Sequence, residues 1–349
     1  MAVKKKNLGE EFSMGDLLDS CSEGEPYIPQ PIEIYVPTGI CLLDWAIGTP
    51  GWPTGRVVEL YGHDSSGKSG LALMAIRNAI QLGGCGAYLD CEHGFDHNRL
   101  KKIGMSSMEG LVLREAETLE ELHKKIETLV RNHHKFPSPM VIVWDSFCSV
   151  SSKSAVKKDD ASVALEPRIN SAWFRKRILR LLNGTPVCLL ILNQIRDTMN
   201  MWNPAKKTAS PGGRALKHYA SLRVELSEAG KIKPRTVGDD YPGIYINAVV
   251  KKNRLGPSYR TANFPFYFER PVDDTQILIR YATQKNILKT TDSGRVVYQD
   301  KAMLKQQLWN YLRENSEDLE ALRESCRVKF GHITPTSTLD LDMDEDEEA

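Results

Sequence analysis

The segment Gly62–Ser69 contains the residue types that bind a triphosphate. It reads GHDSSGKS and matches the phosphate-binding loop G-x-x-x-x-G-K-[ST]. A strand-type run, Arg56–Tyr61, precedes it, and a helix-type run, Gly70–Leu82, follows. Glycines let backbone N–H groups close around a phosphate, and the helix N-terminus adds its positive dipole end. We expect a bound nucleoside triphosphate in contact with Gly62, His63, Asp64, Ser65, Ser66, Gly67, Lys68, Ser69 and Gly70.

Three residues are expected to manage the phosphate charge. Lys68 should reach the β- and γ-phosphates, and the hydroxyl of Ser69 should ligate Mg²⁺. Further along the chain, the segment MVIVWDS is an apolar strand that ends in Asp145. A carboxylate in this place holds the coordination shell of Mg²⁺. ATP and Mg²⁺ are therefore the expected cofactors.

A second acidic segment could supply a catalytic base. Ala87–Asp96 reads AYLDCEHGFD and places Asp90 and Glu92 at the carboxyl end of a predicted strand. Ligands of open α/β sheets bind at this edge, where a carboxylate can orient the water that attacks the γ-phosphate. We assign this role to Glu92, because it comes just after the strand, and keep Asp90 as the alternative.

Two polar segments suit contact with nucleic acid. The strand LLILNQIR ends in Gln194, whose amide can report whether a γ-phosphate is present. The long segment Arg196–Gly213 follows it, and Ser151–Glu166 leads into a basic helix. Aromatic and basic side chains together favour single-stranded DNA, through stacking and phosphate contacts. On this ground the DNA-binding candidates in the second segment are Trp202, Lys206 and Lys207.

Alternating strand and helix patterns must position these residues. The predicted strands are Val57–Tyr61, Gly86–Asp90, Met140–Asp145, Val187–Asn193, Leu222–Leu226, Ile244–Lys251 and Phe264–Phe268. The predicted helices are Leu71–Leu82, Leu119–His133, Pro167–Leu182, Leu304–Leu312 and Leu319–Val328. Helices between the earlier strands predict an α/β fold with a mostly parallel central sheet covered on both faces. The later strands follow one another directly and predict an antiparallel extension.

Composition narrows the class of protein. The chain has 349 residues, 41% of them hydrophobic, and no apolar run long enough for a membrane span. Its seven cysteines include no C-x-x-C pair, which argues against a zinc ribbon and suits a reducing cytoplasm. Leu339–Ala349 holds seven acidic residues and no basic one, so the rest carries a formal charge of +8 against +1 overall. A basic body suits a polyanionic partner, and the tail is either a solubility device or a competitor for the DNA site.

Taken together, these motifs resemble the RecA family of homologous-recombination ATPases. The resemblance runs from about Pro37 to Val328 and rests on GHDSSGKS, LDCEHGFD, VIVWDS, LNQIR, GGRALKHYAS and VVKKNRLGPSYRTANFPF. It implies that Glu92 is the catalytic base, that Gln194 couples the γ-phosphate to the DNA segments, and that Lys68 contacts phosphate. It also implies DNA contacts by two groups of residues, Arg168 and Arg175 in the first region and Arg196, Gly212 and Gly213 in the second. It further implies that Lys252 and Arg254 reach the ATP of a neighbouring subunit as arginine fingers do.

The resemblance includes departures. Asp96 and Arg99 fall where the family binds the adenine of ATP, and Arg99 replaces a tyrosine that stacks on the adenine. Arg254 replaces the usual lysine, which keeps the charge. The expected organisation is an N-terminal segment for subunit contacts at 1–35, an ATPase core at 36–270, a small C-terminal α/β domain at 271–332 and a disordered acidic tail at 333–349. The divergence would suit a phage-encoded relative.

The expected function is that of a DNA-dependent ATPase and recombinase. Its subunits would form a helical filament on single-stranded DNA, pair it with double-stranded DNA and exchange strands. A ring-shaped motor or helicase with the same core is one alternative. A non-catalytic recombination mediator is the other, although intact Lys68, Glu92 and Gln194 argue against it.

Overall fold

The computed structural model describes residues 30–152, 165–197, 208–209, 215–234, 236 and 239–331. Residues 32–349 group into one compact unit. The described helices include none with the length and apolarity needed to cross a membrane. The predicted N-terminal segment and acidic tail lie almost entirely outside the described residues, and the domain boundaries stay predictions.

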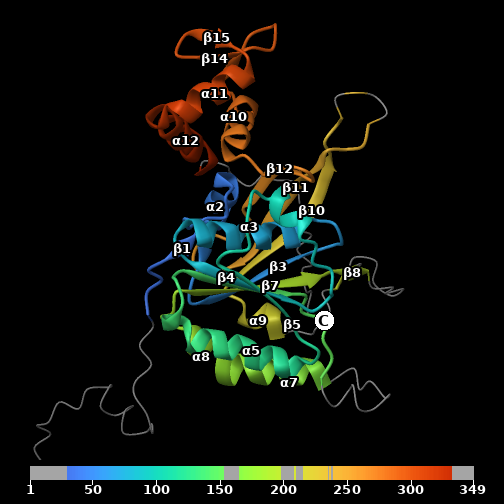
Figure 1. Cartoon of the computed structure of the whole chain (residues 1–349). Helices are drawn as coiled ribbons and strands as arrows, with labels where there is room; N and C mark the ends of the chain where they lie inside the picture. The colour runs from blue at the N-terminus through green and yellow to red at the C-terminus, as the bar shows by residue number, and fades with distance from the viewer. Residues whose placement is uncertain are drawn as a thin grey trace, which may run out of the picture. The chain divides into compact units, whose positions relative to one another are not determined.

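An eight-stranded sheet forms the centre, in the order β12-β11-β10-β3-β7-β6-β4-β5 (Figure 1). Pairing is parallel from β10 through β5 and antiparallel for β11 and β12. The predicted parallel sheet with its antiparallel extension is confirmed. The strands are β3 (Arg56–Gly62), β4 (Cys85–Asp90), β5 (Leu111–Glu115), β6 (Met140–Asp145), β7 (Val187–Gln194), β10 (Leu222–Lys231), β11 (Gly243–Asn253) and β12 (Thr261–Tyr267).

Two short pairs lie beside this sheet. A two-stranded pair joins β1 (Tyr35–Val36) to β2 (Trp52–Pro53), and another joins β8 (Arg196–Asp197) to β9 (Thr208–Ala209). The last strand of the large sheet was predicted at Phe264–Phe268, but β12 begins three residues earlier, at Thr261. It lies at the edge of the sheet, where Pro265 deprives no inner strand of a hydrogen bond.

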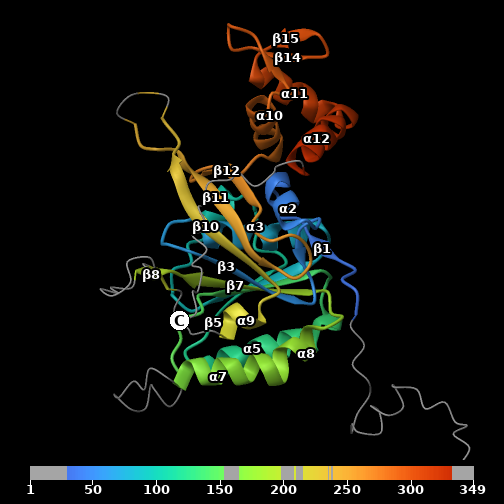
Figure 2. The ribbon, with the colours of Figure 1, turned by 180° about the vertical axis from the view of Figure 1, so that it is seen from behind.

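Helices cover both faces of the sheet (Figures 1 and 2). Alternating side chains of β3 show the division, since Val58 and Leu60 join the core cluster of α3 while Val57 joins the cluster of α5. One face carries α2 (Cys41–Ile47) and α3 (Lys68–Gln81). The other carries α5 (Leu119–Arg131), α7 (Leu165–Trp173), α8 (Leu179–Leu182) and α9 (Ala215–Tyr219).

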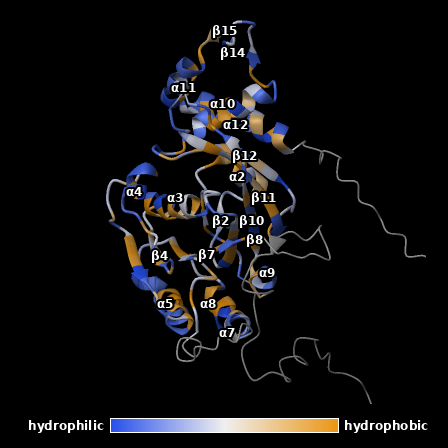
Figure 3. Ribbon diagram, turned by 90° about the vertical axis from the view of Figure 1, so that its right-hand side faces the viewer, coloured by the Kyte–Doolittle hydropathy of each residue, from blue (hydrophilic) through white to orange (hydrophobic). Residues whose placement is uncertain are grey.

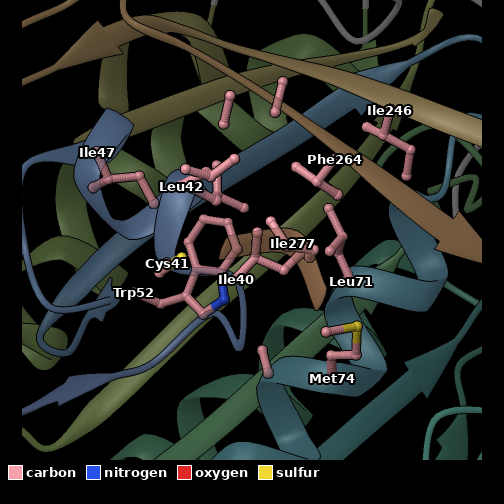
Figure 4. Packing of buried hydrophobic residues seen from close by; sticks show 14 of the residues in the cluster. Ile40, Cys41, Leu42, Ile47, Trp52, Leu71, Met74, Ile246, Phe264 and Ile277 are labelled. Atoms are coloured by element: carbon pink, nitrogen blue, oxygen red, sulfur yellow. The ribbon is translucent and has the colours of Figure 1, made fainter. Parts of the chain in front are cut away.

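Helix α5 shows how the sequence pattern sets this packing. Its buried apolar residues Leu119, Leu122, Ile126 and Val130 recur at helical spacing, and most of the other positions are charged or polar (Figure 3). The Thr118 side chain accepts a hydrogen bond from the third residue on and caps its start. On the opposite face, Figure 4 shows α2 and α3 residues packed with side chains of β11 and β12.

The C-terminal elements pack against α2. Helices α10 (Asp274–Gln284), α11 (Lys305–Glu314) and α12 (Ser316–Gly331) accompany a small sheet of β13 (Lys289–Thr290), β14 (Val296–Tyr298) and β15 (Lys301–Met303). Asp274 accepts a hydrogen bond from the Cys41 backbone amide over 2.7 Å and forms an ion pair with Arg323 over 2.9 Å. One carboxylate therefore links α10, α12 and the first residue of α2.

The predicted helix Pro167–Leu182 is interrupted in the structure. Helix α7 ends at Trp173, a π-helical turn follows at Phe174–Ile178, and α8 completes the segment. The wider turn buries Phe174 and Ile178 while Arg175 stays exposed. The other predicted helices differ from the observed helices only at their ends. A short helix, α4 (Asn98–Lys102), lies between β4 and β5.

Candidate nucleotide site

The phosphate loop links the end of β3 to the first turn of α3. Gly67 precedes the helix with φ 90°, a left-handed conformation that favours glycine. A Cβ on Gly67 would lie 2.4 Å from Ile246 Cδ1, and a Cβ on Gly70 would lie 2.3 Å from Phe266 Cζ. A side chain at either position would require Ile246 or Phe266 to shift. The helix begins at Lys68, three residues before the predicted start, so Lys68 and Ser69 belong to its first turn.

Lys68 is buried within its own loop. Its Nζ donates to the carbonyl oxygens of Gly62 at 2.9 Å and His63 at 2.6 Å, and lies 3.4 Å from Ser66 Oγ. Burial lowers the pKa of the ammonium, although the nearby carboxylates act in the opposite direction. The loop carbonyls therefore hold the cation where an anionic oxygen would be a stronger acceptor. A buried ammonium in this position fits a phosphate group.

Ser69, Tyr88 and Asp145 meet at the carboxyl edge of the sheet. Ser69 Oγ donates to Asp145 Oδ2 over 2.9 Å, and the Tyr88 hydroxyl donates to the same oxygen. Burial raises the pKa of the Asp145 carboxyl. No described group of three His, Cys, Asp or Glu residues could hold a metal ion. One carboxylate and one hydroxyl fit Mg²⁺, which binds few protein ligands and takes others from substrate phosphates.

Glu92 and Asp90 have different surroundings. Asp90 is buried and accepts from the backbone amides of Glu92 at 3.2 Å, Gly94 at 3.4 Å and Phe95 at 2.9 Å. Its carboxylate therefore shapes the loop after β4. Glu92 is exposed, and its Oε1 accepts from the Gln194 amide at 3.1 Å and from the Ser146 hydroxyl. This arrangement favours Glu92 over Asp90 as the base, and the assignment stays a prediction.

A cavity of about 370 Å³ adjoins the phosphate loop. Arg99 lines it, together with Lys102, Tyr267 and Arg270. The Arg270 guanidinium lies over the Tyr267 ring, 3.6 Å from its centroid. Asp96 is absent from the described lining, and its carboxylate accepts from the Asn98 amide over 2.9 Å. The structure thus places Arg99 beside the loop and gives Asp96 a role at the start of α4.

Lys252 and Arg254 contact the end of α9. Lys252 Nζ donates to the carbonyls of Lys217 at 2.9 Å and His218 at 2.7 Å, and Arg254 Nη2 donates to His218 at 3.0 Å. Cations are favourable at a helix C-terminus. Burial lowers the pKa of Lys252, and Arg254 and Arg223 add to this effect. Among the described residues, their side-chain hydrogen bonds go to α9 and not to the phosphate loop.

The DNA-binding candidates are only partly described. Arg168 on α7 and Arg175 on the π-helical turn are exposed. Arg196 belongs to β8, where its backbone pairs with Ala209. The other candidates lie outside the described residues, as does most of both polar segments; they are Trp202, Lys206, Lys207, Gly212 and Gly213.

Sequence reasoning missed several members of the site. Tyr88 lies within a strand, where an aromatic residue is ordinary, so nothing marked it as a partner of Asp145. Ser146 was visible as the residue after Asp145, and its hydroxyl now joins Glu92. Arg270 and Tyr267 come from the end of β12 and its following loop, far from the phosphate loop in sequence.

Comparisons with known proteins agree on one family. The family described as the RecA N-terminal domain matches residues 10–273. A protein RecA of Thermus aquaticus is 33% identical over 321 residues, covering 91% of this chain and 90% of the relative. A protein RecA of Bacillus licheniformis is 30% identical over 330 residues, covering 93% and 90%. A crystal structure of the RadB recombinase shares the fold, with TM-score 0.50, 19% identity, and coverage of 67% of this chain and 97% of that one.

Proposed function

Because this chain belongs to the RecA family, we propose that it is an ATP-dependent DNA recombinase. Its subunits assemble into a helical filament on single-stranded DNA, pair this strand with homologous double-stranded DNA and exchange strands. The relatives that span nine-tenths of the chain are named RecA, and the structural neighbour is named a recombinase. Both names support this function. Residence in the cytoplasm stays a prediction.

The observation that carries the proposal is the hydrogen bond between Gln194 and Glu92. Glu92 follows β4 beside the phosphate loop, and Gln194 ends β7 just before the segment expected to bind DNA. A γ-phosphate that attracts the Gln194 amide would weaken its bond to Glu92. The same movement would free the carboxylate and displace the start of β8. One contact can thus connect hydrolysis with DNA binding.

The residues present fit a nucleotide with Mg²⁺. Lys68 and the amides of the first turn of α3 would hold the phosphates, while Ser69 and Asp145 would hold the metal. Bound Mg²⁺ would neutralise charge on the phosphate oxygens. Arg99, with Tyr267 and Arg270, would lie beside the adenine of the nucleotide.

Glu92 supplies the proton acceptor for hydrolysis. Its carboxylate takes a proton from the water whose oxygen forms the new bond to the γ-phosphorus, and the bond to the ADP oxygen breaks. Ser146 keeps the carboxylate in place once the γ-phosphate has drawn Gln194 away. Asp90 keeps the loop in shape through its three backbone contacts.

Arginine and lysine side chains supply the remaining contacts. Arg168 and Arg175 extend from α7 and the π-helical turn toward solvent and would bind DNA phosphates. Lys252 and Arg254 would leave the end of α9 and act on the ATP of the next subunit. In this role they stabilise transition-state charge only after assembly.

A strand-exchange assay tests the proposal. A labelled single strand is mixed with a homologous duplex, the chain and ATP, and joint molecules are measured on a gel. We expect joint molecules with the homologous duplex and none with a heterologous duplex of equal length. ATP-driven unwinding of a partial duplex without exchange would favour a ring motor. Binding without turnover would favour a mediator.

A further inference from the structure

A buried ion pair joins three strands behind the phosphate loop. Glu59 on β3 is fully buried, and its carboxylate accepts from Arg223 Nε of β10 and from Asn193 Nδ2 of β7, the latter over 2.9 Å. The Arg223 guanidinium also lies over the Tyr61 ring, 4.5 Å from its centroid. A buried charge is costly unless paired, and apolar residues of similar size often serve stability as well. The cluster of Glu59, Asn193 and Arg223 therefore calls for a role beyond packing.

One end of this cluster reaches the γ-phosphate sensor. Asn193 immediately precedes Gln194 on β7, and its side chain is 2% exposed. Its amide nitrogen is held by Glu59, and its Oδ1 lies 3.5 Å from Cys148 Sγ. A movement of the backbone at Gln194 must either carry Asn193 with it or strain the hydrogen bond from Asn193 to Glu59.

The other end reaches α9. Arg223 lies opposite Lys252 in the antiparallel pair of β10 and β11, which run side by side (Figure 2). Glu59 and Arg223 both act electrostatically on Lys252, with opposite signs. Lys252 in turn holds the last carbonyls of α9. The connection therefore runs from Gln194 through the adjacent Asn193 to Glu59 and Arg223, and across the paired strands β10 and β11 to Lys252.

We propose that Glu59 is a positioning residue that fixes Gln194 relative to Lys252, so that a bound γ-phosphate alters the end of α9. The proposal deepens the proposed function and rests on it for the roles of Gln194 and Lys252. Glu59 touches neither nucleotide nor DNA. It balances the charge of Arg223 beside Lys252 and Arg254, and it keeps β7 in register with β3 and β10.

Amide hydrogen exchange tests this inference without DNA. Exchange at Ala215–Tyr219 is measured with and without a slowly hydrolysed ATP analogue in the unsubstituted chain, in Glu59→Gln and in Glu225→Gln. The last is the matched control, because Glu225 also lies on β10 and forms an ion pair with Lys251 of β11 over 2.9 Å. We expect the analogue to change α9 exchange about fivefold or more in the unsubstituted chain and in Glu225→Gln. In Glu59→Gln the change falls below about twofold, with analogue affinity within about threefold of the unsubstituted chain.

Two further variants keep the test decisive. If Glu59→Gln does not unfold cooperatively, Arg223→Lys replaces it, since it keeps the charge and loses the Nε contact. In Gln194→Ala the α9 response should also be lost, and adding Glu59→Gln should cause no further loss. An α9 exchange response that is unchanged in Glu59→Gln or Arg223→Lys overturns the proposal. The proposal is also overturned if the analogue does not change amide exchange in α9 of the unsubstituted chain. An α9 response with ATPase activity indifferent to DNA would refute only the recombinase function.

Discussion

The side-chain amide of Gln194 donates to the Glu92 carboxylate over 3.1 Å, across the end of an intervening strand. In the sheet β6 separates β7 from β4, so Gln194 at the end of β7 and Glu92 after β4 meet across the end of β6. Ser146, the first residue after β6, donates to the same carboxylate oxygen. Three neighbouring strand ends thus converge on the proposed catalytic base.

Removing Lys68 should abolish nucleotide binding. Lys68→Ala deletes a charged donor directed at the phosphates, and hydrogen bonds to charged groups contribute about 1.5–3 kcal/mol each. Two such bonds predict a loss of about 100-fold or more in ATP affinity, measured by titration with a fluorescent ATP analogue. Lys101→Ala, an exposed lysine on α4, is the matched control and should bind normally. Normal binding by Lys68→Ala would refute the phosphate-loop assignment.

Glu92→Gln should separate binding from hydrolysis. The amide cannot accept the proton from water, so kcat should fall about 100-fold or more while ATP affinity stays within about threefold. Asp90→Asn should behave differently, because it weakens the loop that carries Glu92 and lowers both binding and turnover. Single-turnover hydrolysis and equilibrium binding measure the two effects. Hydrolysis at the unsubstituted rate in Glu92→Gln would show that another residue is the catalytic base.

Lys252→Ala should fail in the assembled state. A cation that acts on a neighbour's ATP contributes only after assembly, so DNA-stimulated ATPase activity should fall about 100-fold at high protein concentration. ATP binding by dilute, unassembled chains should stay unchanged. Lys251→Ala, an adjacent exposed lysine, is the control. A loss equal at all concentrations would limit Lys252 to holding the end of α9.

Asp44 should make stability pH-dependent. Burial raises the pKa of its carboxyl from 3.8 to about 7. Between these values the folded chain holds a proton that the unfolded chain lacks, so the free energy of unfolding falls as pH rises and levels off above about 7. Part of this loss has already occurred at pH 5, and the rest occurs between pH 5 and pH 7. Asp44→Asn stays neutral, so its stability relative to the unsubstituted chain should rise by about 1–3 kcal/mol from pH 5 to pH 8, since one pKa unit is worth about 1.4 kcal/mol. Urea unfolding at both pH values measures this, and a stability difference that is the same at pH 5 and pH 8 would contradict the raised pKa.

The centre of the fold and its antiparallel edge could be predicted from the sequence, whereas the opposite edge strand β5 and the short helix α2 could not. The apolar run of β3 and the helix pattern of α3 flank the phosphate-binding loop, a motif that is expected between a strand and a helix. The edge strand β5 was missed because its residues alternate in exposure and Val112 faces solvent, which weakens the apolar signal. Helix α2 was missed because it has only seven residues.

Long-range polar contacts could not be predicted from the sequence either. Glu59 and Arg223 are charged residues within apolar strands, and their pairing depends on the neighbouring positions of β3 and β10. Lys252 and Arg254 were identified by motif alone, whereas their contact with α9 required the structure. The π-helical turn at Phe174–Ile178 leaves no periodic signal because it is one turn long.

The ATPase rate with and without single-stranded DNA tests the central account most directly. It is measured at low salt for the unsubstituted chain and for Gln194→Ala, with ATP binding as a control. The account predicts strong stimulation of the unsubstituted chain by single strands, and a Gln194→Ala variant that binds ATP but is not stimulated. Turnover of the unsubstituted chain that is indifferent to DNA, or full stimulation of Gln194→Ala, would contradict it.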